Sequence, residues 1–272
     1  MTTFTDQLDR TLEISSVPNR IISLVPSQTE LLYDLGLRDE VIGITKFCLH
    51  PEEWFHGKTR VGGTKTHDFE KIKALAPDLI IGNKEENERE QIEQLMERYP
   101  VWMSDIYTLA DALEMIVNLG ALLNRKQEAE ALKIKIEKAF GVFGDFVRQT
   151  PLNNMKVAYF IWRQPYMVAG SRTFIDHMLL RCGFKNVFSS DSFTRYPELS
   201  PGQLKEAAPD IILLSSEPYP FKEKHVAEFQ SICKNAKIIT VDGELFSWYG
   251  SRLLHAPAYF TKLIQSLASV DE

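Results

Sequence analysis

The side chains best suited to bind a ligand lie in two loops in the second half of this 272-residue chain. Both loops follow apolar runs of β-favouring residues, and loops at strand ends commonly carry binding residues. The first loop contributes Trp162, Arg163 and Tyr166. The second contributes Glu244, Phe246, Trp248, Tyr249 and Arg252. The rings can stack on a planar ligand while the polar groups hydrogen-bond it, so the two loops predict a small-molecule site.

The second loop leaves some of these roles open. Phe246 and Trp248 are two residues apart, so they cannot share one face of an extended segment. We expect one of these rings to pack inward and the other to reach the ligand. Arg252 has two interpretations, because a guanidinium can contact a ligand or cap a helix start through an acid such as Asp242 or Glu244.

A third candidate loop, in the first half of the chain, contains Phe47, Cys48 and His50. Cysteine and histidine bind soft metals, and His67 follows further along, so a metal site is one interpretation. A surface loop is the other, and we favour it because the chain does not place three histidines and a carboxylate together as a bare zinc or manganese site would need. A single axial histidine to a corrinoid or haem stays open. We predict no metal ion of the protein's own.

The sequence contains no familiar catalytic motif. It has no nucleophile elbow, Walker loop or dinucleotide fingerprint, and the run from Gly62 to Lys65 lacks the spacing of a phosphate-binding loop. An iron–sulfur reductase, such as half of a nitrogenase-like enzyme, would need cluster-ligating cysteines that are missing here. We therefore predict a protein that is not an enzyme and has no cofactor.

The elements that position the loops are indicated by a pattern that occurs twice. Residues 71–83 read KIKALAPDLIIGN, and residues 203–215 read QLKEAAPDIILLS. Each copy predicts a short helix that ends at Ala-Pro-Asp, because proline cannot continue a helix, and then a strand. The apolar runs do not alternate, which is typical of parallel strands covered on both faces. Two copies predict two similar α/β lobes with a ligand cleft between them.

A long helical stretch separates the two copies. Apolar residues recur at helical spacing from Leu109 to about Thr150, with a break near Asn124-Arg125. The second helix, Lys126 to Arg148, would be about 35 Å long and could join two lobes, and a loop over 150–154 should follow it. We predict an α/β fold of two Rossmann-like three-layer lobes with parallel sheets, residues 1–124 and 151–272, joined by a connecting helix at 125–150.

Near the N-terminus, residues 4–14 predict a β-hairpin or loop at a sheet edge, and a buried strand follows at Arg20 to Leu24. The next helix has a candidate capping box, with Ser27 as the cap and Glu30 three residues later. Gly36 should end that helix.

Composition limits the partners. The net charge of −6 provides no basic field for nucleic acid, and no apolar stretch reaches the 18 or so residues of a membrane span. The N-terminus lacks the charged and apolar regions of a secretory signal. We therefore expect a cytoplasmic monomer if Met1 is the native start, or an exported one if a signal was removed.

Taken together, several segments resemble one protein family. They are RIISLVPSQTELLYDLGL, GITKFCLHP, the paired PDLII and PDIIL, VAGSRTFIDHMLLRCGFKNV and FSWYGSR. Their order is similar to that in the helical-backbone, or class III, periplasmic substrate-binding proteins of ABC importers, which bind cobalamin, ferric siderophores or haem. The similarity extends from about residue 4 to residue 267. It implies capture of a small-molecule metal complex between two lobes and delivery to a permease at the membrane.

The resemblance also implies roles for single residues. Phe47 becomes an aromatic wall, and Thr64 and Asn83 become ligand contacts because they stand where the cobalamin branch has tryptophans. Glu70 occupies the first of two positions at which a glutamate of the family docks onto the permease, and Gly202 occupies the second. We expect a periplasmic or membrane-associated receptor for cobalamin or a ferric siderophore. The alternative, which Gly202 and the missing signal favour, is a cytoplasmic corrinoid or haem carrier or sensor without a permease.

Overall fold

The computed structural model describes residues 1–150, 154–190 and 192–268, and its chain forms two compact units. The N-terminal unit comprises Met1–Ile106, Ala110–Ile136 and Trp248–Arg252. The C-terminal unit comprises Tyr107–Leu109, Glu137–Ser247 and Leu253–Glu272. Two short segments, 107–109 and 248–252, each belong to the other unit than the residues on either side of them. The predicted division at 124 and 150 contains no such exchange of segments. Part of the predicted loop at 150–154 lies outside the described residues.

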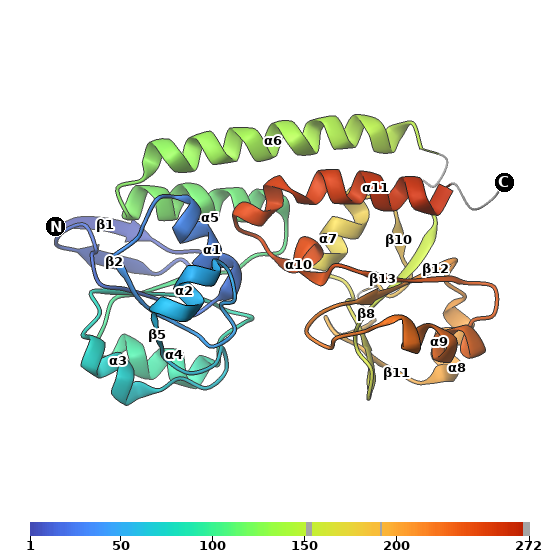
Figure 1. Cartoon of the computed structure of the whole chain (residues 1–272), viewed down its shortest axis with the longest axis horizontal. Coiled ribbons are helices and arrows are strands. Elements are labelled where there is room, and N and C mark those ends of the chain that lie inside the picture. The colour runs from blue at the N-terminus through green and yellow to red at the C-terminus, as the bar shows by residue number, and fades with distance from the viewer. Residues whose placement is uncertain (151–153, 191, 269–272) are drawn as a thin grey trace. The chain divides into compact units, whose positions relative to one another are not determined.

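The N-terminal unit is built on a five-stranded sheet in the order β5-β4-β3-β6-β7 (Figure 1). Its strands are β3 (Ile21–Ser23), β4 (Val41–Ile44), β5 (Thr59–Arg60), β6 (Leu79–Asn83) and β7 (Val101–Ser104). All neighbouring pairs are parallel. β3, β6 and β7 are buried along their whole length, as a sheet with two covered faces requires.

Helices cover this sheet on both faces. They are α1 (Pro26–Asp34), α2 (Glu52–Gly57), α3 (Phe69–Leu75), α4 (Arg89–Met96) and α5 (Leu109–Leu122). Ile72 of α3 and Ile92 of α4 pack with Ile80 of β6 in one core, and Figure 1 shows the two helices together on that side of the sheet. Trp102 of β7 alternates to the opposite face and is fully buried there. The unit therefore has the three layers that the sequence predicts.

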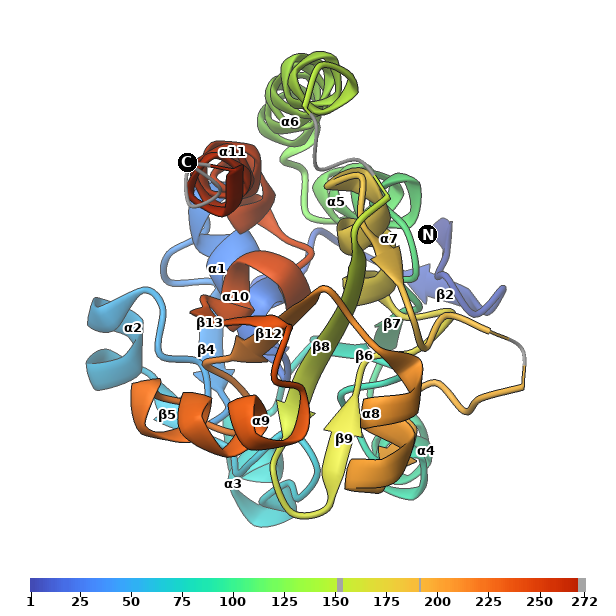
Figure 2. The same cartoon turned by 90° about the vertical axis from the view of Figure 1, so that its right-hand side faces the viewer.

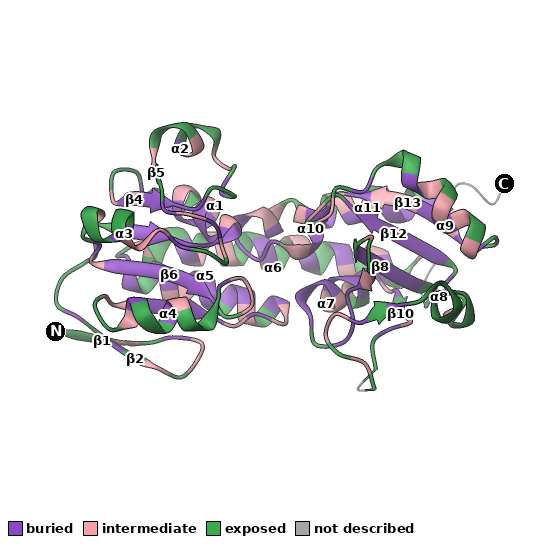
Figure 3. Ribbon diagram, turned by 90° about the horizontal axis from the view of Figure 1, so that it is seen from below, coloured by how far each residue is buried: buried purple, intermediate pink, exposed green. Residues whose placement is uncertain are grey.

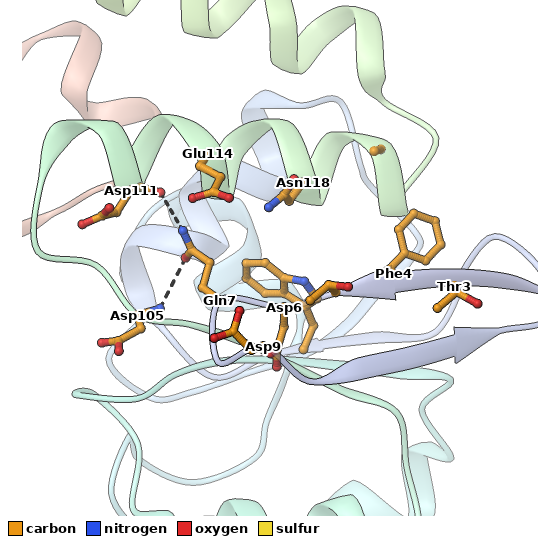
Figure 4. Close-up of a pocket in the computed structure, with 12 residues that line it drawn as sticks. Thr3, Phe4, Asp6, Gln7, Asp9, Asp105, Asp111, Glu114 and Asn118 are labelled. Carbon is orange, nitrogen blue, oxygen red and sulfur yellow. Dashed lines mark hydrogen bonds between the residues drawn. The ribbon is translucent and has the colours of Figure 1, made fainter.

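The predicted hairpin forms and closes one sheet edge. β1 (Thr2–Thr5) and β2 (Thr11–Ile14) are antiparallel. In the turn between them, the backbone N–H of Gln7 donates to the carbonyl of Met103 in β7 at 3.1 Å. The Gln7 side chain donates to the carbonyl of Asp111 at 2.9 Å and accepts from the backbone N–H of Asp105 at 3.3 Å, beside a cavity of about 500 Å³ (Figure 4). These bonds cover an edge strand that would otherwise expose unpaired backbone groups.

The C-terminal unit is built on a six-stranded sheet, in which β11-β9-β8-β12-β13 are consecutive and β10 also pairs with β8. The strands are β8 (Lys156–Trp162), β9 (Tyr166–Val168), β10 (Lys185–Asn186), β11 (Glu198–Leu199), β12 (Ile211–Ser215) and β13 (Lys237–Val241). β8, β10, β12 and β13 are parallel, whereas β9 pairs antiparallel with β8 and with β11. β12 is buried along its whole length, like β6, and β8 is buried except at its two ends (Figure 3).

Helices also cover both faces of this second sheet. They are α7 (Phe174–Arg181), α8 (Pro201–Ala207), α9 (Val226–Ile232), α10 (Gly243–Ser247) and α11 (Ala256–Ala268), with short 3₁₀ turns at Glu223–His225 and Ser251–Leu254. Leu204 of α8 and Phe229 of α9 pack with Phe160 of β8 on the face seen in Figure 2. On the opposite face, the ring of Phe246 in α10 lies 5.1 Å from that of Tyr159 and 4.6 Å from that of Phe260 in α11. The predicted fold class is confirmed.

The repeated sequence pattern folds in the same way in each unit. α3 ends at Ala76 and α8 at Ala208, and both alanines adopt the left-handed conformation, with φ of 43° and 44°. The aspartates that follow the prolines then tie each strand start to its neighbour. Asp78 accepts from the backbone N–H groups of Asn19 and Arg20 at 2.9 Å each, and Asp210 accepts from that of Lys156 at 2.8 Å. In both copies, the Ala-Pro-Asp motif thus ends a helix, and its aspartate anchors the start of the neighbouring strand.

The long helical stretch is divided as predicted. α5 ends at Leu122 and α6 (Lys126–Arg148) follows, with Asn124 at φ 55° between them. A residue with positive φ interrupts the helical path, and asparagine tolerates this conformation better than most. Residues of α6 up to Ile136 belong to the N-terminal unit and those from Glu137 to the C-terminal unit.

The start of α1 differs from the prediction. The helix begins at Pro26, its cap residue is Val25, and no side chain caps it, so the predicted box of Ser27 and Glu30 is wrong. The reason is that the fixed φ of proline suits the first helical position, which moves the cap two residues earlier, from Ser27 to Val25. Gly36, with φ 87°, follows the helix end as predicted. None of the helices in the described part of the chain combines the length and apolarity of a membrane span.

Candidate functional site

In the N-terminal unit, the candidate residues gather where the parallel strands end. The carboxyl ends of β3, β4, β6 and β7 share one edge of the sheet, the usual place for a ligand in an open α/β fold. The loop with Phe47 follows β4, Thr64 lies in the loop after β5, and Asn83 ends β6. The predicted residues of this unit therefore lie at one edge of the sheet, although their side chains have different environments.

Phe47 is the most accessible of these side chains, with 50% of its surface exposed, and Leu49 next to it is similarly exposed. The ammonium group of Lys46 lies 5.1 Å from the centre of the Phe47 ring. Gly63 lies close beneath, because a Cβ there would be 3.2 Å from the ring. An exposed ring and leucine on one loop present an apolar surface that a ligand can cover.

Cys48 has the opposite environment. It is fully buried, and its Sγ lies 3.1 Å from the hydroxyls of Thr29 and Thr45. Burial raises the pKa of the Cys48 thiol, so it stays protonated and unreactive. We therefore leave Cys48 out of the candidate site, because it fixes the loop from inside. No group of three or more His, Cys, Asp or Glu in the described ranges is arranged to hold a metal ion.

Asn83 and Thr64 lie in two loops at the carboxyl edge of this sheet, and hydrogen bonds connect the loops. Asn83 is buried, and its side-chain oxygen accepts from the backbone N–H groups of Glu85 and Glu86 at 2.8 and 3.0 Å. Asn87 accepts from the backbone N–H of Asn83 at 2.8 Å and donates to the carbonyl of Thr64 at 2.9 Å. This network joins the loop after β6 to the loop after β5, so the Asn83 side chain is used to hold the two loops together. Thr64 is half-buried and stays partly accessible to a ligand.

The segment 248–252 completes this unit by packing against α1. Arg252 forms a bidentate ion pair with Glu30, at 2.9 and 2.6 Å, and its guanidinium lies 4.6 Å from the centre of the Trp248 ring. Glu30, which the sequence did not indicate, is thus an acid partner of Arg252, because the segment packs on α1 of the same unit. The His50 ring contacts Trp248 at 5.7 Å, and Tyr249 is buried.

Two aromatic side chains lie at the edge of the C-terminal sheet, exposed Trp162 and half-buried Tyr219. Trp162 ends β8, is 40% exposed, donates to the carbonyl of Gln164 at 3.1 Å and has the Tyr219 ring 5.7 Å away. Ring stacking on a ligand is therefore open to Trp162 and Tyr219. Tyr219 was not predicted, although it follows the second copy of the repeat at the position that Asn87 has after the first.

Arg163 and Tyr166 turn away from this edge toward α9. The Arg163 Nε donates to one oxygen of Glu228 at 2.8 Å, and the Tyr166 hydroxyl donates to the other at 2.5 Å. Burial and the bond to Glu228 raise the pKa of Tyr166 to about 12. Both predicted contacts are thus engaged in a network that fixes the β8–β9 turn.

Beside Trp162, acidic and hydroxyl groups surround the ends of β12 and β13. Ser247 donates to the carboxylate of Glu217 at 2.7 Å, and Ser216 accepts from the backbone N–H of Gly243 at 2.9 Å. Glu244 is half-buried in the first turn of α10. Phe246 is in the core and leaves the candidate site, and Trp248, expected to be the accessible ring of the two, is buried as well.

The two predicted docking positions are equivalent in the fold. Glu70 is exposed in the first turn of α3, which Asp68 caps. Gly202 occupies the corresponding turn of α8, capped by Ser200, and a Cβ there would meet only the Ser200 hydroxyl at 3.8 Å. The surface at Gly202 therefore has room for a side chain, but lacks a carboxylate. Glu206 is exposed one turn further along α8.

The chain was compared with models of known protein families. The model of the periplasmic binding protein family matches residues 21–236. The chain belongs to the periplasmic binding protein family. Membership confirms the prediction of a binding protein that is not an enzyme, and it does not favour the alternative of a cytoplasmic carrier or sensor.

Individual relatives of this binding protein are more distant. A vitamin B12-binding protein of Pectobacterium carotovorum subsp. carotovorum (strain PC1) is 26% identical over 254 residues, which cover 93% of this chain and 91% of the relative. A vitamin B12-binding protein of Vibrio campbellii is 27% identical over 199 residues, 72% of this chain and 70% of the relative.

Solved structures share the fold of the binding protein. The periplasmic haem-binding protein RhuT from Roseiflexus sp. RS-1 has a TM-score of 0.78 at 22% identity, covering 92% of this chain and 99% of that one. The periplasmic vitamin B12 binding protein BtuF of Vibrio cholerae has a TM-score of 0.76 at 22% identity, covering 91% and 98%. Structures with different ligands match equally well, so this similarity establishes the fold.

Proposed function

We propose that this binding protein is the substrate-binding component of an ABC importer and that its ligand is a cobalamin-type corrinoid. The observation that carries the proposal is the similarity, over 93% of the chain, to a vitamin B12-binding protein. The structure supplies matching surfaces, because each sheet has an exposed aromatic ring at its carboxyl edge, Phe47 in one unit and Trp162 in the other. Such rings suit the apolar face of a corrin macrocycle.

The contribution of the rings follows from their exposure. Phe47 is 50% and Trp162 is 40% exposed. Aromatic side chains carry on the order of 150–250 Å², so covering either exposed part removes roughly 90 Å² from water, worth about 2 kcal/mol at ~25 cal/mol per Å². That free energy corresponds to roughly 30-fold in affinity.

Isothermal titration calorimetry with cyanocobalamin, haem and a ferric catecholate siderophore tests the ligand. We expect saturable binding of cyanocobalamin, weakened roughly 10- to 30-fold in Phe47→Ala and in Trp162→Ala. Val142→Ala is the matched control, since Val142 is an exposed apolar side chain on α6, away from both edges. Tighter binding of haem or of the siderophore than of cyanocobalamin would refute the corrinoid assignment.

The partner we propose is an ABC permease, with Glu70 as a docking residue and the binding protein outside the cytoplasmic membrane. Glu70 is exposed at the start of α3, so its carboxylate can meet a basic side chain without rearrangement. Glu70→Arg should abolish ligand uptake by cells and leave the dissociation constant of the purified protein unchanged. Glu137→Arg, at an exposed position on α6, should affect neither. Normal uptake with Glu70→Arg would exclude docking through this residue.

A further inference from the structure

The turn between β8 and β9 lies at the surface of the C-terminal unit and carries the Trp162 ring. Gln164 and Pro165 in the turn are exposed, and so is Trp162 at its start. Within the turn, the Trp162 indole donates to the carbonyl of Gln164 at 3.1 Å. Hydrogen bonds inside an exposed turn compete with water, so groups outside the turn decide where the ring stands.

Glu228 holds this turn from α9. One carboxylate oxygen accepts from the Arg163 Nε at 2.8 Å and the other from the Tyr166 hydroxyl at 2.5 Å, so one side chain fixes both ends of the turn. Hydrogen bonds to an ionised acceptor are stronger than those between neutral groups. Phe229, the next residue of α9, is fully buried, and its ring lies 4.7 Å from that of Phe160 in β8. Glu228 therefore connects the exposed turn to a helix that is anchored in the core.

The same network reaches the second ring at this edge. Hydrogen bonds to Glu228 and to the Tyr219 side chain raise the pKa of the Arg163 guanidinium. The backbone N–H of Tyr219 donates to the carbonyl of Ile161 in β8 at 3.2 Å. The rings of Trp162 and Tyr219 meet edge to face, with their centres 5.7 Å apart. Arg163 thus links Glu228 to Tyr219, and Tyr219 contacts Trp162.

The Glu228 carboxylate is itself poorly placed to bind a ligand, because it is half-buried and both its oxygens accept from protein donors. Its effect on a ligand is indirect. A ring that is already held in place loses less conformational freedom when the ligand covers it. Ordering one flexible side chain on binding corresponds to roughly a 2- to 12-fold loss of affinity, and a preorganised ring avoids this loss.

We propose that Glu228 is a positioning residue of the ligand site, which acts through Arg163 and Tyr166 to set the Trp162 and Tyr219 rings before a planar apolar ligand arrives. The effect on affinity rests on the function proposed above. The position of the Trp162 ring in the ligand-free protein does not rest on it and is tested separately.

Trp162 provides the probe for the ligand-free protein, because the other tryptophans of the chain are buried, namely Trp54, Trp102 and Trp248. Acrylamide therefore quenches mainly the fluorescence of Trp162, and being uncharged it does not respond to the loss of a carboxylate. Trp162→Phe gives the background. We expect Glu228→Ala to raise the quenching constant, because the turn and its ring become more mobile.

Three further variants show whether the hydrogen bonds of Glu228 are responsible. Glu228→Gln should restore most of the wild-type quenching, because an amide can accept from Arg163 and donate to the Tyr166 hydroxyl. Tyr166→Phe removes one donor and keeps the ring, so it should give part of the rise even if Glu228→Ala fails to fold. Glu93→Ala is the matched control, since it removes a carboxylate paired with Arg89 at 2.7 Å on α4, and it should change nothing.

Calorimetric titration with cyanocobalamin measures the effect on the ligand. Glu228→Ala should weaken binding roughly 2- to 12-fold, and most of this loss should disappear in the Trp162→Ala background, because Glu228 acts through that ring. A loss of equal size in both backgrounds would show direct contact with the ligand and overturn the proposal.

Unchanged quenching or unchanged affinity in Glu228→Ala would also overturn the proposal, whatever happens to the melting temperature, because a purely structural ion pair affects stability alone. A wild type that binds no cyanocobalamin would refute the function proposed above. The quenching comparison would then decide by itself whether Glu228 positions Trp162.

Discussion

Gly120 makes a sharp test of how α5 and α6 pack within the N-terminal unit. A Cβ at Gly120 would lie 2.2 Å from the Cβ of Ala129, where ordinary contact begins near 3.4 Å. Ala129 is fully buried, so it cannot move aside into solvent. Gly120→Ala must therefore separate the two helices by more than an ångström or distort one of them.

The expected magnitude combines two opposing effects. Alanine is favoured over glycine inside a helix by about 1 kcal/mol. Overpacking a tight contact costs up to about 3 kcal/mol. We expect Gly120→Ala to lower the free energy of unfolding by about 2 kcal/mol, which corresponds to a fall in melting temperature of roughly 4–8 °C for a protein of this size.

Thermal and urea unfolding followed by circular dichroism measure the effect. Gly141→Ala is the matched control on α6, since nothing lies within 4 Å of a Cβ there, and it should raise the melting temperature. Ala129→Gly should rescue Gly120→Ala, so that the double variant is more stable than the sum of the single changes by the cost of the clash, up to about 3 kcal/mol. A rise in stability for Gly120→Ala, or strict additivity in the double variant, would refute the packing argument.

Two further predictions concern carboxylates of the N-terminal unit. Asp78→Ala removes the acceptor for two backbone N–H groups just before β3. It should lower the free energy of unfolding, measured by urea denaturation, by about 1–2 kcal/mol. An unchanged free energy of unfolding would show that water replaces these hydrogen bonds. The backbone N–H of Arg38, and then the charge of Arg125, hold the pKa of Glu40 below its usual value. Glu40 therefore contributes stability above its unfolded pKa of 4.5, and this contribution is lost as the pH falls through the lower folded pKa. Glu40→Gln should flatten the stability profile below pH ~4.5, and a profile that parallels the wild type there would contradict this assignment.

Much of the fold was predictable because its signals are local. Proline in each Ala-Pro-Asp ends a helix whatever surrounds it, and both copies do so here. The 3.6-residue periodicity predicted α6 from Lys126 to Arg148, and the break at Asn124 was visible as a gap in that pattern. The start of α1 was missed because Pro26 and Ser27 give competing signals: with Pro26 at the first helical position, Ser27 is the second residue and cannot be the cap.

The candidate site was predictable at the level of loops and not of side chains. Strand ends are readable from apolar runs, so the loops with Phe47 and Trp162 were found. The sequence does not show which side chains of a loop point into the core. Cys48 is fully buried, whereas Phe47 next to it is half exposed. Arg163 was expected at a ligand, yet its partner is Glu228, 65 residues away on α9.

The sequence by itself determined the two helix–strand copies, the bounds of α6, and which loops follow the strand ends. These properties depend on backbone stereochemistry and on apolar spacing over a few residues. Only the tertiary structure decided that Arg252 pairs with Glu30 across 222 residues, that Phe246 belongs to the core, and that α9 holds the β8–β9 turn. Exposure and partners of a side chain depend on which distant surfaces fold against it, and neighbouring residues carry little of that information.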